Sequence, residues 1–319
     1  MEDSDLFKDA GYWLDEPLDN DDWGGLYRAR YLPHDREVLL RVFPSNTERE
    51  AGAWELVLAE IQAWARLDHP GVLQVLDWGK GGNRCFLATT VPAGQPLAAV
   101  LLEERGADDA EHIFANLLVS VEAARQWGVL HLGLGSTNIW VAADHAVEVG
   151  EFGFWYVARE FPALGVRGGA FQAPEQVQGG HASAATDVYS LGIIYIALRF
   201  GLSVAVAVAE DAPLPAELGE LYPHIARCLE RQPLARYRSA GDMADALGLR
   251  SDGQPCQEYR DCPLCRLKEE IQQQAPGRDW SVPYSGRRSP RQVDWVRYAW
   301  IAIIALAFAA AVVWWLALR

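Results

Sequence analysis

Three cysteines stand close together in the last quarter of the chain, at a spacing that is typical of metal ligands. Five residues separate Cys256 from Cys262, and Cys262 and Cys265 enclose a Pro-Leu dipeptide. Cys-Pro-x-Cys turns commonly hold Zn²⁺ through thiolates, and a structural zinc ion takes four ligands. The cysteines therefore predict a zinc site whose fourth ligand comes from Asp261, Cys228, His224 or a partner protein. Free thiols, a redox pair and palmitoylation near a membrane are the competing interpretations.

The composition of the 319 residues predicts a folded protein with an acidic body and a basic tail. Half of the residues are apolar, which excludes global disorder and a collagen-like chain. Residues 1–249 carry 36 acidic and 18 basic side chains, a net charge of −18, whereas residues 250–319 carry 7 and 10, a net charge of +3. Such a body does not favour binding to nucleic acid. Residues 1–11 indicate an acidic tail, and the five cysteines indicate reduced thiols of a cytosolic compartment.

Residues 299–318 predict a transmembrane helix. The stretch AWIAIIALAFAAAVVWWLAL contains no charge and is long enough, at about 1.5 Å per residue, to cross a hydrocarbon core of about 30 Å. Tryptophans stand near both of its ends, where indole rings favour the headgroup region; a buried core helix is the alternative. Five arginines precede the span and one follows it, which places the N-terminal body in the cytoplasm: Arg278, Arg287, Arg288, Arg291 and Arg297 before, and Arg319 after.

Residues 250–298 predict a cysteine-containing segment followed by a basic juxtamembrane linker. A run of three glutamines, three prolines and paired arginines in residues 270–297 is typical of a flexible connection. Its arginines could contact anionic lipid at about 1 kcal/mol each, although a topology signal explains them equally well.

The body itself divides into a strand-rich part and a helical part. Short β-like runs occupy residues 12–43 and 72–91, and a helix between them is predicted to begin at a capping box, Thr47 to Glu50, and to continue through apolar residues at helical spacing as far as Ala65. Helical patterns dominate residues 109–127, 187–200, 216–231 and 239–248. Strands with one helix, followed by a helical half, predict an α+β fold of two lobes with a cleft between them.

At this point the chain resembles the bacterial Ser/Thr protein kinases. Six stretches carry the resemblance over about residues 12–248, in the order that the family has them: EIQAWARLDHPGVLQVLDWG, GVLHLGLGSTNIWV, EFGFWYV, FQAPEQ, DVYSLGIIYIAL and CLERQPLARYRSAGDMADAL. The resemblance implies a kinase-like domain over residues 12–249. Its small lobe, with one helix called αC, would cover about residues 12–93, and its large lobe about 94–249.

The residues that the family uses to hold ATP phosphates are altered here. Asp19 and Asp21 replace the first two glycines of the phosphate loop, and only Gly24 remains. Each carboxylate close to a phosphate would cost about 4 kcal/mol at an effective dielectric of about 20, unless the loop is a solvated hairpin tip that points away. Arg41 replaces the phosphate-pairing lysine. We expect Arg41 to form a salt bridge with Glu60, the glutamate of αC, and so to hold that helix without a nucleotide.

The catalytic loop lacks the groups that carry phosphoryl transfer in the family. In HLGLGSTN, Gly133 replaces the base that accepts the substrate proton, and Gly135 replaces the lysine that steadies the γ-phosphate. A positioned base contributes about 10² to 10⁴ in rate. Asn138 is retained, and either binds Mg²⁺ or ties the loop backbone. Glu151 replaces the metal-binding aspartate, and its longer side chain suits octahedral Mg²⁺ poorly, so metal binding is expected to be weak or absent.

The positions that only support the fold match the family. Glu175 and Arg236 match its buried ion pair, and Asp187 matches the aspartate that braces the catalytic loop. Between Glu151 and Glu175 there is no serine or threonine, and Tyr156 is the only hydroxyl there that could be phosphorylated. Activation by phosphorylation of a Ser or Thr in this segment is thereby excluded.

The resemblance therefore implies a pseudokinase that is tethered to the bacterial inner membrane by residues 299–318, with its body in the cytoplasm. It would bind a cytosolic or membrane protein as a regulator or scaffold, require no cofactor and bind ATP and Mg²⁺ weakly or not at all. The alternative is a weak or atypical kinase, or an ATP-binding switch, that uses Arg41, Asn138 and Glu151. A third hypothesis is a homodimer linked by zinc at residues 256–265.

Overall fold

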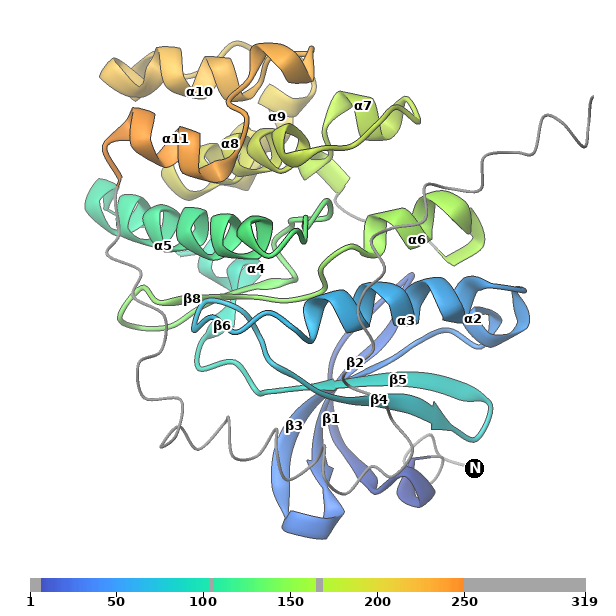
Figure 1. Cartoon of the computed structure of the whole chain (residues 1–319). Coiled ribbons are helices and arrows are strands. Elements are labelled where there is room, and N and C mark those ends of the chain that lie inside the picture. The colour runs from blue at the N-terminus through green and yellow to red at the C-terminus, as the bar shows by residue number, and fades with distance from the viewer. Residues whose placement is uncertain (1–6, 104–105, 165–168, 250–319) are drawn as a thin grey trace, which may run out of the picture. The chain divides into compact units, whose positions relative to one another are not determined.

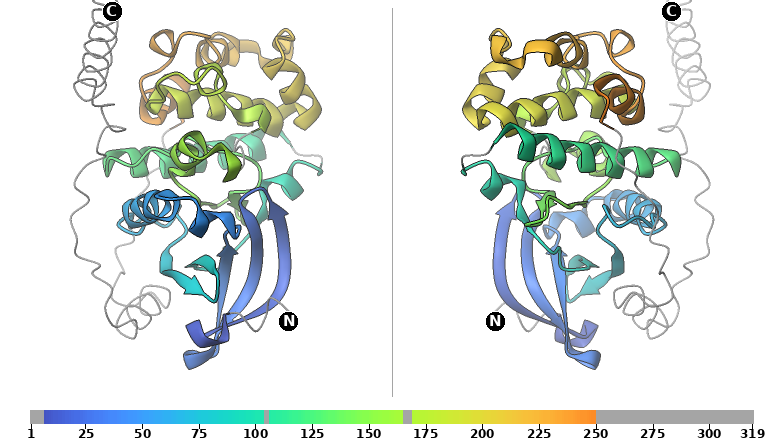
Figure 2. Two further views of the ribbon diagram at one scale, coloured as in Figure 1. Left: turned by 90° about the vertical axis from the view of Figure 1, so that its right-hand side faces the viewer. Right: turned by 90° about the vertical axis from the view of Figure 1, so that its left-hand side faces the viewer.

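The computed structural model describes residues 7–103, 106–164 and 169–249, all of which belong to one compact unit of the chain, Met1–Arg278. In this unit, a lobe built on a β-sheet lies beside a lobe built of helices (Figure 1, Figure 2), as the predicted α+β fold requires. Within the described ranges, no helix combines the length and the apolar character that a membrane crossing demands. The predicted zinc ligands Cys256, Cys262 and Cys265, the linker and the transmembrane helix lie outside the described residues.

The small lobe is organised by a five-stranded antiparallel sheet with the strand order β1-β2-β3-β5-β4. β1 is an edge strand, and its pairing with β2 shifts register between Leu14 and Glu16 and again between Pro17 and Asp19. Pro17 has no N–H to give to a ladder, which an edge strand tolerates. The strands are β1 (Tyr12–Asp21), β2 (Gly24–Tyr31), β3 (Arg36–Val42), β4 (Val75–Gly81) and β5 (Arg84–Thr89).

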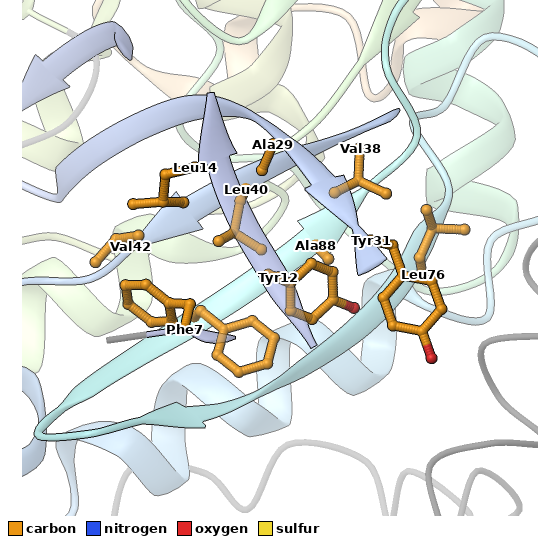
Figure 3. Close-up of a cluster of buried hydrophobic side chains, with 11 residues drawn as sticks. Phe7, Tyr12, Leu14, Ala29, Tyr31, Val38, Leu40, Val42, Leu76 and Ala88 are labelled. Carbon is orange, nitrogen blue, oxygen red and sulfur yellow. The ribbon is translucent and has the colours of Figure 1, made fainter. Parts of the chain in front are cut away.

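Alternate residues of these strands point to opposite faces of the sheet, because the side-chain period of a strand is two. Leu40 belongs to an apolar cluster on one face (Figure 3), whereas Arg41 turns to the other. The Phe7 ring meets the Phe86 ring edge-on in this cluster at 5.9 Å. The members are Phe7, Tyr12, Leu14, Ala29, Tyr31, Val38, Leu40, Val42, Leu76, Phe86 and Ala88.

The helix of the small lobe begins later than the sequence predicts. The expected capping box gives only a short helix, α2 (Asn46–Arg49), and no side chain caps its first turn. The main helix is α3 (Ala53–Trp64), which corresponds to the predicted αC. Gly52 separates the two with a left-handed backbone, φ +90°, a conformation that glycine adopts without the steric cost that other residues incur. A single helix from Thr47 to Ala65 was therefore the wrong prediction.

The large lobe consists of helices that pack on a small three-stranded sheet. This sheet has the order β6-β7-β8, and its strands are β6 (Gln95–Pro96), β7 (Ile139–Val141) and β8 (Val147–Val149). The long helix α5 (Ala107–Gln126) packs against β8 on one side and against α8 (Ala184–Phe200) on another. α8 is buried along nearly its whole length. The other helices are α4 (Leu97–Val100), α6 (Phe154–Glu160), α7 (Pro174–Val177), α9 (Leu202–Ala209), α10 (Tyr222–Cys228) and α11 (Ala240–Leu247).

Three of the four predicted helical ranges agree with α5, α8 and α11 to within a few residues. The fourth, 216–231, is not one helix: a 3-10 helix (Ala216–Leu221), interrupted at Gly219 with φ +57°, precedes α10, which ends at Cys228. The lobes are joined where Leu73 donates its N–H to the Val149 carbonyl at 2.9 Å and Val149 donates to Gly71 at 3.0 Å. α6 contacts α3 across the same boundary.

The apolar cluster of the small lobe gives a test of what stabilises the sheet. Leu40 is fully buried in it, whereas Leu32, in the turn between β2 and β3, is 46% exposed. We expect Leu40→Ala to lower the free energy of unfolding by about 2–5 kcal/mol, because a cavity replaces packed methyl groups. Leu32→Ala should change it by less than about 0.5 kcal/mol. Urea unfolding followed by circular dichroism measures both, and equal losses would contradict this account of the sheet.

Candidate functional site

The boundary between the lobes holds a buried cluster of charge centred on Arg41 of β3. Its Nε donates to Glu151 Oε1 at 2.9 Å, and its Nη2 lies 2.6 Å from the same oxygen. Its Nη1 contacts Asp21 Oδ1 at 3.0 Å and the Gly24 carbonyl at 3.1 Å. Burial lowers the pKa of Arg41, but the charges of Glu151 and Asp21 more than offset it, so the pKa lies above its ordinary value. The guanidinium is thus held charged between two carboxylates.

The prediction of a salt bridge between Arg41 and Glu60 is therefore wrong, because Arg41 pairs with Glu151 and Asp21. Glu60 is buried on α3, but its carboxylate lies against Gly153, where a Cβ would collide with it. Gly153 also has a left-handed backbone, φ +77°, so two independent constraints favour glycine at this position. The partner of Arg41 is instead the glutamate at the start of the Glu-Phe-Gly segment.

Glu151 sits in an unusual backbone conformation. Its φ is +64°, a region that costs about 1–3 kcal/mol for a residue with a Cβ and persists only where surrounding contacts enforce it. The ion pair with Arg41 is such a contact. The carboxylate oxygen nearest Arg41 accepts a hydrogen bond from Nε and lies 2.6 Å from Nη2, so the guanidinium already balances the charge that a hard cation would otherwise neutralise.

The turn between β1 and β2 is folded inward onto this cluster. Asp21 accepts a hydrogen bond from the Trp23 N–H at 2.8 Å while it pairs with Arg41. Trp23 is only 1% exposed. Its ring stacks on Phe154, the first residue of α6, at 5.4 Å with 13° between the planes, and meets Phe43 edge-on at 6.5 Å. The sequence left two alternatives for the acidic loop: carboxylates that face the phosphates, or a solvated tip that points away. Asp22 is exposed, as a solvated tip requires, whereas Asp21 pairs with Arg41 and matches neither alternative.

The segment that corresponds to the catalytic loop is tied to α8 by Asp187. Its two carboxylate oxygens accept from the N–H groups of His131, at 3.0 Å, and Leu132, at 2.6 Å, which is the bracing contact that the sequence predicts. Leu132 has φ +58°, and these bonds help to hold it there. The His131 ring packs on Phe152 at 4.7 Å. Its Nδ1 accepts from Gly133 N–H, so Nε2 carries the proton and donates to the Gly150 carbonyl at 2.8 Å.

Asn138 uses both ends of its amide inside the same segment. Its Nδ2 donates to the Gly133 carbonyl at 2.8 Å, and its Oδ1 accepts from the Gly135 N–H at 3.0 Å. The side chain is 1% exposed. The geometry matches the backbone-tying alternative of the sequence prediction. Gly133 and Gly135 carry no side chain, so neither position supplies a base or a cation.

The deep part of the cleft is filled by side chains. Trp140 of β7 is buried, and a Cβ on Gly150 would lie 3.3 Å from the Trp140 ring and 3.4 Å from the Trp64 ring, so both indoles converge there. The cavity that remains has a volume of about 10 Å³, room for about one water. An open groove of about 540 Å³ lies in front of Trp140. The small cavity is lined by Leu26, Leu39, Arg41, Trp64, Leu73, Leu87, Thr89, Trp140 and Glu151.

The chain that connects the lobes offers few backbone donors to this cleft. The N–H of Thr90 is bonded to the Gln74 carbonyl at 2.9 Å, and the N–H of Ala93 to Glu148 at 2.8 Å. Pro92 has no N–H. The Thr90 carbonyl accepts from the Thr89 hydroxyl at 3.2 Å. Three of the four amides from residue 90 to 93 therefore cannot bind a ligand.

The ion pair between Glu175 and Arg236 is present, as predicted, and is bidentate, with both N–O distances at 2.8 Å. Thr186 also donates to Glu175 at 2.8 Å. Burial raises the pKa of Glu175, but the hydrogen bonds from Arg236 and Thr186 more than offset this, and the pKa lies below its ordinary value. Next to it, Gln176 donates to the Leu132 carbonyl at 2.6 Å. Gln176 therefore connects the chain next to this pair with the catalytic-loop segment.

The described cysteines, Cys85 and Cys228, are buried free thiols. Burial raises the pKa of Cys85 to about 11 and that of Cys228 to about 12, so neither is a thiolate at neutral pH. Across residues 7–103, 106–164 and 169–249, no group of three His, Cys, Asp or Glu side chains is placed to hold a metal ion. Trp23 and Trp140 were not identified from the sequence. Each is a large aromatic residue near a position that the family retains, because Trp23 precedes Gly24 and Trp140 follows Asn138 by two residues.

Comparison with known proteins places these features in a family. The family model described as "Protein kinase domain" matches residues 22–230. The serine/threonine-protein kinase PknA of Mycobacterium tuberculosis is 29% identical over 237 residues, which cover 66% of this chain and 54% of PknA. PknL of the same organism is 28% identical over 284 residues, covering 81% of this chain and 69% of PknL. The chain thus spans about half the length of PknA.

Among solved structures, the Mycobacterium tuberculosis PknI kinase domain matches with a TM-score of 0.61 and 20% identity. The match covers 75% of this chain and 95% of the PknI domain. At that identity the likeness shows the fold alone, which is the two-lobed kinase fold.

The Arg41–Glu151 pair yields a stability prediction. We expect Glu151→Gln to lower the free energy of unfolding by about 3 kcal/mol, the low end for a buried pair that loses one partner, because Asp21 remains beside the guanidinium. The control is Glu160→Gln, which removes an exposed partner of Arg159 and should change stability by less than about 1 kcal/mol. Denaturant unfolding measures both variants. Equal effects would show that burial does not strengthen the Arg41 pair.

The Glu175–Arg236 pair predicts a dependence of stability on pH. Because the pKa of Glu175 is lower in the folded than in the unfolded chain, its contribution is complete above the ordinary value of 4.5 and is lost as the pH falls below it. Glu175→Gln should flatten the decline in unfolding free energy between pH 5 and about 3, whereas Glu217→Gln, at an exposed glutamate, should not. Parallel pH profiles for the wild type and Glu175→Gln would contradict this assignment.

Proposed function

This chain belongs to the protein kinase family, through a domain over residues 22–230, and from that premise we propose that it regulates or scaffolds other proteins with little or no phosphoryl transfer. The observation that carries the proposal is the direct contact between Arg41 and Glu151. These residues stand where the family has the lysine for the nucleotide phosphates and the aspartate for the metal ion. Here their charges neutralise each other, so neither is available to a phosphate or a cation.

The composition of the catalytic loop supports the same proposal. Gly133 stands at the position of the base that accepts the proton of the substrate hydroxyl, and such a base contributes about 10² to 10⁴ in rate. Asn138, the retained candidate for Mg²⁺, has Oδ1 bonded to Gly135 and Nδ2 bonded to Gly133. The groups that would transfer a phosphoryl group are thus replaced or already engaged, whereas Asp187, Glu175 and Arg236, which support the fold, keep their contacts.

The shape of the cleft argues against tight nucleotide binding. The cavity that Arg41 and Glu151 line holds about 10 Å³, far less than pockets for small ligands, which have about 300–1,000 Å³; the larger groove in front of Trp140 is not lined by either residue. Pro92 offers no N–H, and the neighbouring amides of Thr90 and Ala93 are bonded within the protein. We therefore propose that ATP and Mg²⁺ bind weakly or not at all and that no cofactor is required.

One observation favours a second candidate, a weak or atypical kinase or an ATP-binding switch. The groove in front of Trp140, about 540 Å³, is of the size that small ligands occupy, and Trp140 separates it from the small cavity that Arg41 and Glu151 line. A ligand that displaced Trp140, separated Arg41 from Glu151 and broke the bonds of Asn138 to Gly133 and Gly135 would recover all three groups. The energy needed to break the buried pair makes this the less favoured candidate.

The remaining proposals rest on sequence alone, because they concern residues outside those that the structure describes. We propose that residues 299–318 anchor the chain in a bacterial inner membrane with the kinase-like domain in the cytoplasm. The protein partner would then be a cytosolic or membrane protein near that surface. Zinc at Cys256, Cys262 and Cys265, and a homodimer built on it, form a separate hypothesis that competes with free thiols, a redox pair and palmitoylation.

The experiment that tests the proposed function measures transfer and binding on the full chain in detergent micelles. With radiolabelled ATP and Mg²⁺ or Mn²⁺, we expect no phosphate on the chain itself or on mixed Ser, Thr and Tyr peptides above the level of Asn138→Ala. A melting experiment should show no shift with ATP. Saturation to about 100 times Kd would add about 2.7 kcal/mol of stability, or several degrees in Tm. Transfer that is lost in both Asn138→Ala and Glu151→Gln would replace this proposal with the second candidate.

A further inference from the structure

We propose that the turn between β1 and β2 is a hairpin latch, formed by Asp21, Trp23, Arg41 and Phe154, that holds helix α6 against α3 without a nucleotide. The inference rests on the proposed function and extends it, because it identifies the side chains that keep the two lobes together in place of a ligand. Its four members come from β1, from the turn, from β3 and from the first position of α6.

The polar half of the latch fixes the path of the turn. Asp21 accepts from the Trp23 N–H at 2.8 Å and from Arg41 Nη1 at 3.0 Å, and the same nitrogen of Arg41 lies 3.1 Å from the Gly24 carbonyl. Gly24 has φ +94°, and a Cβ there would collide with the Val42 carbonyl. The turn is therefore pressed onto β3, and the retained glycine permits that close approach. This arrangement directs Trp23 into the protein instead of toward solvent.

The aromatic half of the latch fixes α6. Trp23 stacks on Phe154 at 5.4 Å, and both rings meet Phe43 edge-on, at 6.5 Å and 5.8 Å. The Trp54 ring of α3 also packs on Phe43, with 5.8 Å between the ring centres. The four aromatic rings thus connect the turn, the end of β3, α3 and α6 in one packed group, and such pairs add to the stabilisation that burial already gives.

α6 depends on packing against the rest of the domain to hold its position. It has only seven residues, far fewer than the 12–15 that an isolated helix needs to be even marginally stable in water. It starts directly after Gly153, whose N–H is bonded to the His131 carbonyl at 3.0 Å. Its buried residues are Phe154, Trp155, Val157 and Ala158. Tertiary packing must therefore keep α6 helical, and Trp23 supplies the stacked contact at its first turn.

The latch is tested by hydrogen exchange of the amides of residues 154–160 in the full chain in detergent micelles. In Trp23→Ala, we expect these amides to exchange about tenfold faster or more, since the loss of one aromatic pair alone corresponds to a factor approaching ten. The amides of β3 and of residues 131–138 should keep their protection. Trp13→Ala is the matched control, because Trp13 lies on β1 and is 37% exposed; it should leave α6 unchanged.

A second variant, Asp21→Asn, and the addition of Mg²⁺-ATP give two further measurements on α6. If Trp23→Ala does not fold, Asp21→Asn, which retains the shape of the side chain and removes its charge, should accelerate exchange of α6 by a smaller factor. If the amides of residues 154–160 exchange at the wild-type rate in whichever of these two variants folds, the latch is overturned. Addition of Mg²⁺-ATP to the wild type separates the latch from the proposed function. Protection of residues 154–160 that appears only with ATP would overturn both, whereas protection that needs neither ATP nor Trp23 would overturn the latch alone.

Discussion

The Arg41 side chain is only 3% exposed, so its charge must be matched inside the protein, and this match determines how the cleft is built. Desolvation of a single ion costs several kcal/mol, and only close, well-oriented partners offset it. Arg41 is matched by Glu151 from the large lobe and by Asp21 from the hairpin. Because these two carboxylates come from different parts of the fold, their contact with one guanidinium fixes the hairpin, β3 and the Glu-Phe-Gly segment relative to one another.

Two buried ion pairs in the domain have different relations to the rest of the family. The Glu175–Arg236 pair is one that the resemblance implies, and its geometry is bidentate with added support from Thr186. The Arg41–Glu151 pair joins positions that the family uses for a phosphate and a metal ion. Both pairs hold segments together that lie far apart in the sequence.

Much of the fold could be predicted from the sequence, because strand alternation and helical spacing are local signals. The alternation in β3 places Leu40 and Arg41 on opposite faces, and the patterns of α5, α8 and α11 were found to within a few residues. The break at Gly52 was missed, since a capping-box pattern describes one turn and says nothing of the residue that ends it. The partner of Arg41 was also missed. Its choice between Glu60 and Glu151 depends on the orientation of α3, which no local pattern specifies. Trp23 has meaning only once Phe154 is placed beside it.

The pairing of Arg41 with Glu151 also bears on evolutionary reversibility. A return to the family's residues requires a lysine at 41 and an aspartate at 151, and either change alone shortens one side of a buried contact. Either change keeps the opposite charges but loses the close guanidinium–carboxylate geometry, which weakens the pair in a domain whose typical stability is only about 5–15 kcal/mol. Each single change would therefore weaken the protein. Trp140 would still fill the part of the cleft next to the pair. Selection for stability alone would therefore favour keeping Arg41 and Glu151 together.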